Sequence, residues 1–417
     1  MYVRSLRIQN LRCFEEAEVQ LHYPGKKLKG GPDLPNVNLL LGNNGVGKTT
    51  VLKATALGVL ERILASSGLK PDHLVRRRKA ETKSTLRGRA VLSLLLHPED
   101  LAGVEAPSVV RSSVRVTKFK DYEWFPSAHE RAGDEAPPGE RIWNELFNDD
   151  SPAFFLVGYG STRFATGASE FEPLPSQRKR RSLRYQRVAG LFEDFVGLTP
   201  LSLWLPRTAS EDPGRFLEVV DLLNDLLPDE ARFSGEIEKD EYLFEHCGIP
   251  VPLGALSDGY RAYVGWISDL LYNTSLGAPK GTRLRDARGV VLVDEIDLHL
   301  HPEWQREVVP TVARTFPNLQ FVLTTHSPIV AGTLSAQNIF VLEMDGSGAS
   351  TIRQFEEPIH GLNADQILVS SYFGLDTTRA PGAENELRQL SRKAMSGDSA
   401  AAVSFLKKLA SGTDPSR

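Results

Sequence analysis

A glycine-rich loop that ends in lysine and threonine occupies residues 42–49 and has the pattern G-x-x-x-x-G-K-T. It follows the apolar run 37–41 and precedes a segment, 49–65, whose apolar residues recur at helical spacing, so it connects a strand to a helix. In such a loop, backbone N–H groups and the helix N-terminus attract phosphate, Lys48 reaches the outer phosphates and the Thr49 hydroxyl can bind magnesium. The pattern therefore predicts a nucleotide site that includes Asn43, Asn44, Gly45, Val46, Gly47, Lys48, Thr49 and Thr50.

Two carboxylates, Asp294 and Glu295, end a second apolar run at residues 290–293. In α/β sheets, ligands gather at the carboxyl ends of the strands. On its own, the run reads as a buried strand that ends in solvated acids. Together with the Lys48 loop it indicates phosphoryl chemistry, with Asp294 holding magnesium and Glu295 orienting or deprotonating the attacking water.

Two further segments follow the same logic. His326 comes directly after the apolar run 321–323, so it is expected at another strand end, where it could contact the terminal phosphate or be structural. Ser257, Asp258 and Gly259 open a helix, with Ser257 as N-cap and anion donor, or as the cap of an ordinary surface helix. His299 and His301 form an H-x-H pair, for which a packing or dimer-contact role is favoured over metal binding.

In this order, residues 42–49, 256–260, 290–295 and His326 resemble the ABC-type ATPase heads of the SMC and RecF class. The opening stretch 8–14 looks like the first strand pair of that class. The run 294–302, together with 325–328, is most similar to bacterial AAA ATPases grouped with OLD-type proteins and antiphage-defence ATPases. The resemblance covers roughly residues 1–60 and 250–345.

The resemblance implies an α/β fold, namely a P-loop ABC-type ATPase head with a mixed central sheet, N-terminal antiparallel strands and a helical lid insertion. We expect four parts: residues 1–70 with the phosphate loop, an insertion and helical lid at 71–250, the second part of the ATPase core at 251–360, and a helical tail at 361–417. No sustained heptads separate Lys48 from Ser257, so the long SMC coiled-coil arm is not expected.

For the site, the resemblance implies ATP and magnesium as ligands, Glu295 and His326 as catalytic residues, and Thr49 and Asp294 at the metal. Arg12 would approach the nucleotide. Ser257, Asp258 and Gly259 would complete the phosphate site of a second copy, so a homodimer or higher oligomer is expected; Asp258 stands where transporter signatures usually have glycine. The position of the glutamine loop stays open between 159–160, Gln177 and Gln186.

Composition limits the remaining possibilities. The 417 residues are 41% hydrophobic and 24% charged, which is typical of globular proteins, and no apolar run approaches the roughly 20 residues that cross a bilayer. Two cysteines and an N-terminus without a long apolar segment lead us to expect a cytoplasmic protein without membrane association. The net charge of −4 confines any DNA or RNA contact to local basic patches, for which the candidates are Arg76, Arg77, Arg78, Arg178, Lys179, Arg180 and Arg181.

Three functions are compatible with these features. The favoured one is a magnesium-dependent ATPase that dimerises around ATP and regulates a bacterial antiphage system, with a separate nuclease or toxin as effector. The effector is expected on another chain because the tail after His326 lacks the acidic constellation of a TOPRIM nuclease. The alternatives are a RecF-like repair ATPase that clamps DNA, and a nucleotide-gated scaffold with negligible turnover.

Overall fold

The computed structural model describes residues 1–26, 30–61, 63–67, 69–77, 85–97, 108–126, 155–163, 183–194, 196–228, 230–238, 241–278, 281–379 and 381–410. The chain divides into two compact units, Met1–Gly361 and Leu362–Arg417. In the described part of the chain, no helix combines the length and apolarity that a membrane span requires.

An antiparallel sheet opens the first unit, with strand order β2-β1-β4-β5-β6. Its strands are β1 (Tyr2–Leu11), β2 (Phe14–Gln20), β4 (Leu86–Leu95), β5 (Val109–Phe119) and β6 (Tyr122–Trp124). Alternate residues are buried, as a sheet with one covered face requires. Leu6, for example, pairs with Val19 on one side and Leu92 on the other. This buried face packs on helix α1 (Lys48–Leu60).

The sheet changes how the predicted insertion is understood. Residues 86–124 were assigned to an insertion apart from the N-terminal strands, but β4 pairs with β1 along most of its length. The pairing joins strands about 80 residues apart in sequence, and such non-local pairing leaves no trace in a local hydrophobic pattern. The N-terminal antiparallel strands are confirmed, and the sheet they belong to is larger than expected.

The central sheet is mixed, as predicted, with strand order β14-β13-β3-β12-β11-β7. Five strands are parallel: β3 (Val37–Leu41), β7 (Leu156–Tyr159), β11 (Gly289–Val293), β12 (Leu319–Thr325) and β13 (Ile339–Met344). The edge strand β14 (Ser350–Arg353) is antiparallel to β13. Every residue of β3, β7, β11 and β12 is buried, which explains their nearly continuous apolar sequences.

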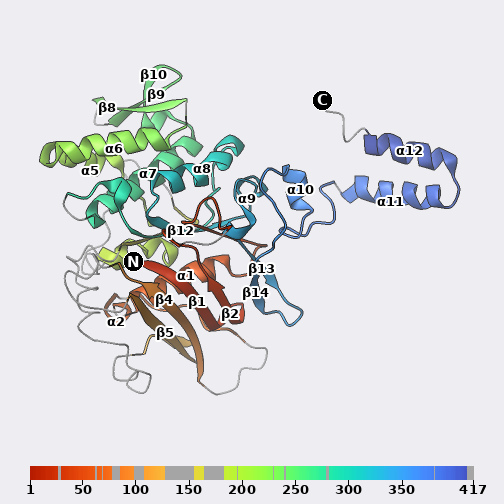
Figure 1. Cartoon of the computed structure of the whole chain (residues 1–417), viewed down its shortest axis with the longest axis horizontal. Coiled ribbons are helices and arrows are strands. Elements are labelled where there is room, and N and C mark those ends of the chain that lie inside the picture. The colour runs from red at the N-terminus through yellow and green to blue at the C-terminus, as the bar shows by residue number, and fades with distance from the viewer. Residues whose placement is uncertain are drawn as a thin grey trace. The chain divides into compact units, whose positions relative to one another are not determined.

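Helices cover this core (Figure 1). The longer ones are α5 (Leu201–Glu211), α6 (Pro213–Leu226), α7 (Asp258–Gly277) and α8 (Pro302–Thr315), and α6 packs on both α7 and α8. The predicted lid region also contains a small antiparallel sheet, β8 (Ala231–Glu238), β9 (Glu241–His246) and β10 (Ile249–Pro252), beside the helices. Short helical segments complete the unit: α2 (Leu64–Ser67), α4 (Leu183–Gln186), η2 (Ala189–Leu191), η3 (Leu253–Ala255), η4 (Leu284–Asp286), α9 (Pro328–Ala331) and η5 (Ala336–Asn338).

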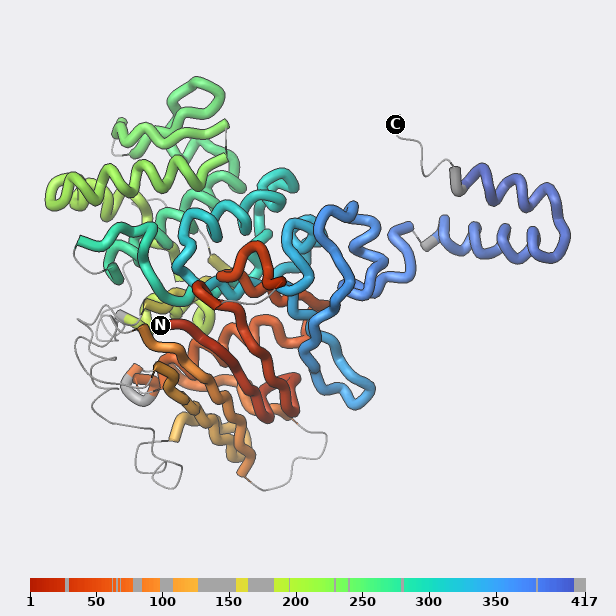
Figure 2. The backbone as a smooth tube through the Cα atoms, in the orientation of Figure 1, coloured from red at the N-terminus to blue at the C-terminus, as the bar shows by residue number. Residues whose placement is uncertain are grey.

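The second unit is helical. It contains α10 (Ala364–Leu368), α11 (Pro381–Met395) and α12 (Ser399–Ala410). Figure 2 traces α11 and α12 as a hairpin of two helices, with Leu387 and Ala401 buried and Lys408 paired with Glu386.

Candidate nucleotide site

The phosphate loop lies between the end of β3 and the start of α1. Gly45 and Gly47 have φ angles of 82° and 102°, a left-handed conformation that side chains other than glycine resist. A Cβ on Gly47 would lie 2.4 Å from Cys13 Sγ, whereas one on Gly45 would meet nothing within 4 Å. Position 47 therefore requires glycine both for its backbone conformation and for close packing. Position 45 requires glycine for its conformation, and a side chain there would project into open space.

Lys48 is held inside the loop that precedes it. Its Nζ donates to the carbonyl oxygens of Gly42 (2.8 Å) and Asn43 (3.1 Å). Burial lowers the pKa of Lys48 below its ordinary value, while Asp294, Glu295 and Asp297 act in the opposite direction. The ammonium group thus lies in a desolvated cradle next to acidic residues, where a phosphate group could take over the role of the carbonyl oxygens.

Asp294 is tied to the phosphate loop and to the neighbouring strand. Its Oδ2 accepts a hydrogen bond from Thr49 Oγ1 (2.7 Å), and its Oδ1 accepts one from Thr324 Oγ1 (2.6 Å). The parallel pairing of β11 with β12, and of β12 with β3, places all three strand ends at one edge of the sheet. A buried carboxylate is expected to be paired in this way.

Glu295 adopts an unusual backbone conformation. Its φ angle of 49° is in the left-handed region, which a non-glycine residue occupies only where its surroundings enforce it. Its N–H donates to Thr324 Oγ1 (2.7 Å), and its carbonyl oxygen accepts from Leu298 N–H (3.0 Å) and from Arg163 Nη2 (2.6 Å). The chain therefore turns sharply at Glu295, directly after the buried strand.

A pocket of about 240 Å³ brings these elements together. Residues from four segments that are far apart in sequence line it: Arg12, Cys13, Asn44, Gly45, Gly47, Lys48, Thr49, Thr50, Asp294, Glu295 and His326. The predicted residues Asn43 and Val46 belong to the same loop without lining the pocket. Burial, and then the charge of Lys48, lower the pKa of His326 below its ordinary value, so the imidazole is neutral at pH 7.

The pocket fits a nucleotide with a divalent cation. A glycine whose Cβ would project into open space, a buried lysine and the start of a helix are the features by which backbone N–H groups and one cation bind a polyphosphate. The Thr49 hydroxyl and the Asp294 carboxylate are hard oxygen donors on the same side of the loop, as magnesium prefers.

Ser257, Asp258 and Gly259 do not line this pocket. Ser257 is exposed at the N-cap position of α7, where it was predicted, but its side chain makes no capping hydrogen bond. Its hydroxyl is left available to another molecule. Asp258 is exposed and pairs with Arg261, one turn into the helix.

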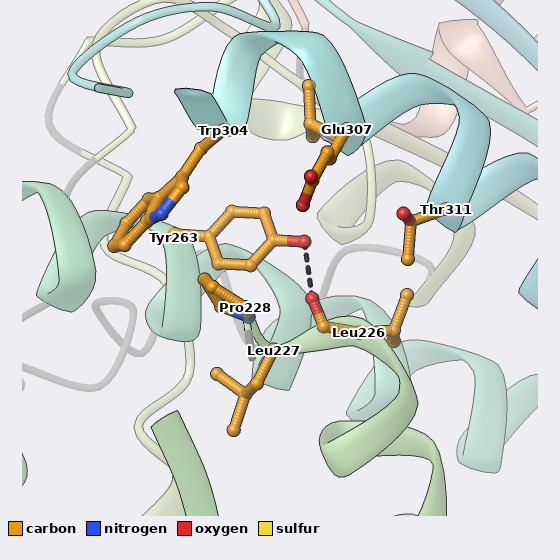
Figure 3. A pocket seen from close by; sticks show the side chains of 8 residues that line it. Leu226, Leu227, Pro228, Tyr263, Trp304, Glu307 and Thr311 are labelled. Atoms are coloured by element: carbon orange, nitrogen blue, oxygen red, sulfur yellow. Dashed lines mark hydrogen bonds between the residues drawn. The ribbon is translucent and has the colours of Figure 1, made fainter. Parts of the chain in front are cut away.

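The start of α7 is packed against the segment that follows the acids. A Cβ on Gly259 would lie 2.8 Å from the carbonyl oxygen of His299, so only glycine allows this approach. The Tyr260 and Trp304 rings meet edge to face with centroids 4.1 Å apart. Figure 3 shows the next turn of α7, where Tyr263 lies against Trp304 and donates to the carbonyl oxygen of Leu226, beside a cavity of about 20 Å³. The cavity has room for about one water molecule, so this region is packed core.

The remaining predicted residues lie away from the pocket or outside the described residues. Arg76 donates to the carbonyl oxygens of Cys13 and Gly348, which gives it a structural role, and Arg77 is exposed beside His73. Arg78, Gln177 and residues 178–181 are outside the described part of the chain. Gln186 lies on α4. His299 and His301 are exposed, and the described residues contain no cluster of three His, Cys, Asp or Glu side chains suited to a metal.

Sequence reasoning missed Arg163. It lies four residues after Tyr159, the last residue of β7, and its guanidinium donates to the backbone carbonyls of Gly160, Asp294 and Glu295. Burial lowers the pKa of Arg163 to about 10, while the three acids Asp294, Asp297 and Glu295 act against this shift. The signal that could have found it is its place just after β7, which is parallel to β11 and so ends at the same sheet edge as the acids.

Two AAA-domain families and several proteins of phage-defence type are similar to parts of the chain. A family described as "AAA domain, putative AbiEii toxin, Type IV TA system" matches residues 208–331, and one described as "AAA domain" matches residues 5–83. The Septu protein PtuA of Bacillus mycoides is 26% identical over 380 residues, which cover 90% of this chain and 45% of that protein. The Retron Ec83 probable ATPase of Escherichia coli is 34% identical over 125 residues, 30% of this chain and 23% of that protein.

Among solved structures, the SMC head bound to the C-winged helix domain of ScpA aligns with 85% of this chain and 98% of its own, at a TM-score of 0.49 and 15% identity. The SMC head domain from Thermotoga maritima aligns with a TM-score of 0.44 and 14% identity, over 86% of this chain and all of that chain. The chain spans less than half the length of the curated relatives. The family and sequence matches confirm the similarity to AAA ATPases of the antiphage-defence group.

Proposed function

We propose that this chain binds ATP with magnesium and hydrolyses it to ADP and phosphate in a dimer that closes around the nucleotide. The observation that supports the proposal most strongly is the convergence of Lys48, Thr49, Asp294, Glu295 and His326 on one pocket. The AAA family matches and the relatives described as probable ATPases support the same class of activity.

The residues suggest a division of labour. Glu295 accepts a proton from a water molecule whose oxygen attacks the terminal phosphorus, and the bond between that phosphorus and the bridging oxygen breaks to release ADP. Lys48 stabilises the negative charge on the phosphate oxygens. His326, neutral at pH 7, can donate a hydrogen bond to the transferred group.

Thr49 and Asp294 would hold the magnesium ion, which would neutralise charge on the phosphates. Their hydrogen bond of 2.7 Å fixes both oxygen donors on one side of the loop. Thr324 holds the other oxygen of Asp294, so the carboxylate is oriented before any ligand binds.

The second copy of the chain is proposed to contribute Ser257 and Gly259. In one chain these residues lie outside the pocket, and the exposed Ser257 hydroxyl and the first N–H groups of α7 form a donor surface for phosphate. A dimer in which each α7 start faces the Lys48 loop of the other copy would use this surface twice.

The wider role is proposed to be regulation of antiphage defence together with a separate nuclease or toxin. The similarity to a Septu protein and to retron ATPases supports this role. An ATPase whose two copies separate after hydrolysis can present or release an effector in step with nucleotide turnover.

Phosphate release in the presence of magnesium and ATP tests the activity. We expect turnover by the wild type, at least 100-fold loss in Glu295→Gln with nucleotide binding retained, and loss of nucleotide binding in Lys48→Ala. Arg207→Ala is the matched control, because Arg207 is exposed and its partner, Glu211, lies on the same helix, α5. Equal and negligible phosphate release by the wild type and Glu295→Gln would instead indicate a nucleotide-gated scaffold.

A further inference from the structure

Arg163 donates hydrogen bonds to two backbone carbonyls at the end of β11, where the acidic residues follow. Its Nη1 donates to the carbonyl oxygens of Gly160 (3.1 Å) and Asp294 (2.5 Å), and its Nη2 donates to that of Glu295 (2.6 Å). The planar guanidinium suits this task, since its fixed fork can serve adjacent acceptors at once. A lysine in its place could offer charge without the fork.

These bonds bear directly on the strained residue. The N–H of Asp294 donates to the carbonyl oxygen of Tyr159 (2.8 Å), and the N–H of Glu295 donates to Thr324 Oγ1. With Arg163 on the carbonyl side, the peptide groups on both sides of Glu295 are fixed. A glutamate keeps a left-handed backbone conformation only where the surrounding contacts enforce it. If φ of Glu295 relaxed, its carboxylate would move away from the pocket.

The charges around Arg163 also favour a role in holding the backbone at Glu295. Asp294, Glu295 and Asp297 all surround the Arg163 guanidinium closely enough to favour its charged form against the effect of burial. The side chain remains protonated at neutral pH and offsets part of the negative charge of the three acids. Because its donors are directed at main-chain carbonyls, it holds the backbone and leaves Asp294 and Glu295 to line the pocket.

The segment that carries Arg163 is itself anchored. The Tyr159 hydroxyl donates to Asp269 Oδ2 (2.9 Å), a buried carboxylate on α7. A Cβ on Gly160 would lie 2.1 Å from the carbonyl oxygen of Gly190, so the loop fits tightly against η2. Arg163 is thus presented from a fixed platform that is in contact with the same helix whose start carries Ser257.

We propose that Arg163 is a positioning residue, which holds Glu295 in its left-handed conformation and thereby places the carboxylate for activation of water. The proposal rests on the proposed ATPase function and adds to it a residue that acts through the backbone. The platform of Tyr159 and Asp269 keeps Arg163 in reach of the two carbonyls.

Steady-state turnover and nucleotide binding of Arg163→Ala and Arg163→Lys test the proposal. We expect kcat to fall about 100-fold in Arg163→Ala and at least 10-fold in Arg163→Lys, while the affinity for a fluorescent ATP analogue stays within about threefold of wild type. Retained affinity also reports that the variant is folded; should Arg163→Ala fail to fold, Arg163→Lys decides. A kcat within twofold of wild type in the folded variant would overturn the proposal.

A double-mutant cycle separates positioning of Glu295 from a general structural role. If Arg163 acts through Glu295, Arg163→Ala has no further effect on the residual turnover of Glu295→Ala. A further tenfold loss in the double variant would contradict the proposal. Arg207→Ala serves as control in both backgrounds.

A crystal structure of Arg163→Ala gives a readout that does not depend on turnover. We expect φ of Glu295 to leave the left-handed region in this variant. If the wild type releases no phosphate, the proposed function fails while this test still applies. A Glu295 that keeps its φ angle near 49° without the guanidinium would refute the positioning role.

Discussion

At the scale of single residues, the site depends on unusual backbone conformations, on a glycine that leaves no room for a side chain, and on hydrogen bonds that orient carboxylates. Gly47 is in contact with Cys13 and Phe14 of the first hairpin, and Glu295 is held in a left-handed conformation. Asp294 accepts hydrogen bonds from the Thr49 hydroxyl, in the first turn of α1, and from the Thr324 hydroxyl, near the end of β12. In the proposed ATPase, the reactive groups are therefore arranged before nucleotide binds, which would reduce the reorganisation needed for catalysis.

Two glycines of the phosphate loop provide a matched pair of substitutions. In Gly45→Ala the cost is the left-handed conformation alone, about 1–2 kcal/mol. In Gly47→Ala the same conformational cost is joined by collision with Cys13 Sγ and the Phe14 ring, so we expect greater destabilisation and at least tenfold weaker ATP binding. Urea unfolding and nucleotide titration measure both effects. Equal losses in the two variants would contradict the assignment of Gly47 to a packing contact.

At the scale of elements, the sequence predicted the strand ends well, because a buried apolar run followed by polar side chains is a local pattern. That pattern identified the Lys48 loop, Asp294, Glu295 and His326, and the parallel pairing of β3, β12 and β11 brings them to one edge. Pairing of β1 with β4 could not be predicted, since it depends on contacts between distant segments. Arg163 could not be predicted because its hydrogen-bond partners are main-chain carbonyls. Every residue has such a carbonyl, so no residue type in the sequence marks the contact.

The connection between α7 and β7 is a prediction at the same scale. Asp269 accepts hydrogen bonds from the Tyr159 hydroxyl, Asn273 Nδ2 and the N–H of Thr199. In Asp269→Asn, the amide NH₂ would face one of these donors, so we expect the free energy of unfolding to fall by about 1–3 kcal/mol. Urea denaturation measures this, with Asp258→Asn as control because Asp258 is exposed. If Asp269→Asn lowers the free energy of unfolding no more than Asp258→Asn does, the buried hydrogen bonds of Asp269 contribute little to stability.

At the scale of the whole molecule, the start of α7, for which we propose phosphate binding, and the pocket around Lys48 are separate features of one chain. Their separation is what the resemblance to SMC and RecF heads implies for a site completed by a second copy. The sequence predicted a helix start at Ser257 and a loop before α1, and both are present. The relation between two copies is not encoded in any local pattern. It requires a measurement on the assembled protein.

The most direct test of the dimer is the mass of Glu295→Gln in solution, measured by light scattering with saturating ATP and magnesium. Because this variant should bind ATP without hydrolysing it, we predict a stable dimer with nucleotide and a smaller species without it. Ser257→Arg places a bulky cation at the exposed start of α7, so adding it to Glu295→Gln should prevent association. A Glu295→Gln protein that stays monomeric with bound ATP, together with normal hydrolysis by Ser257→Arg alone, would contradict closure of two copies around the nucleotide.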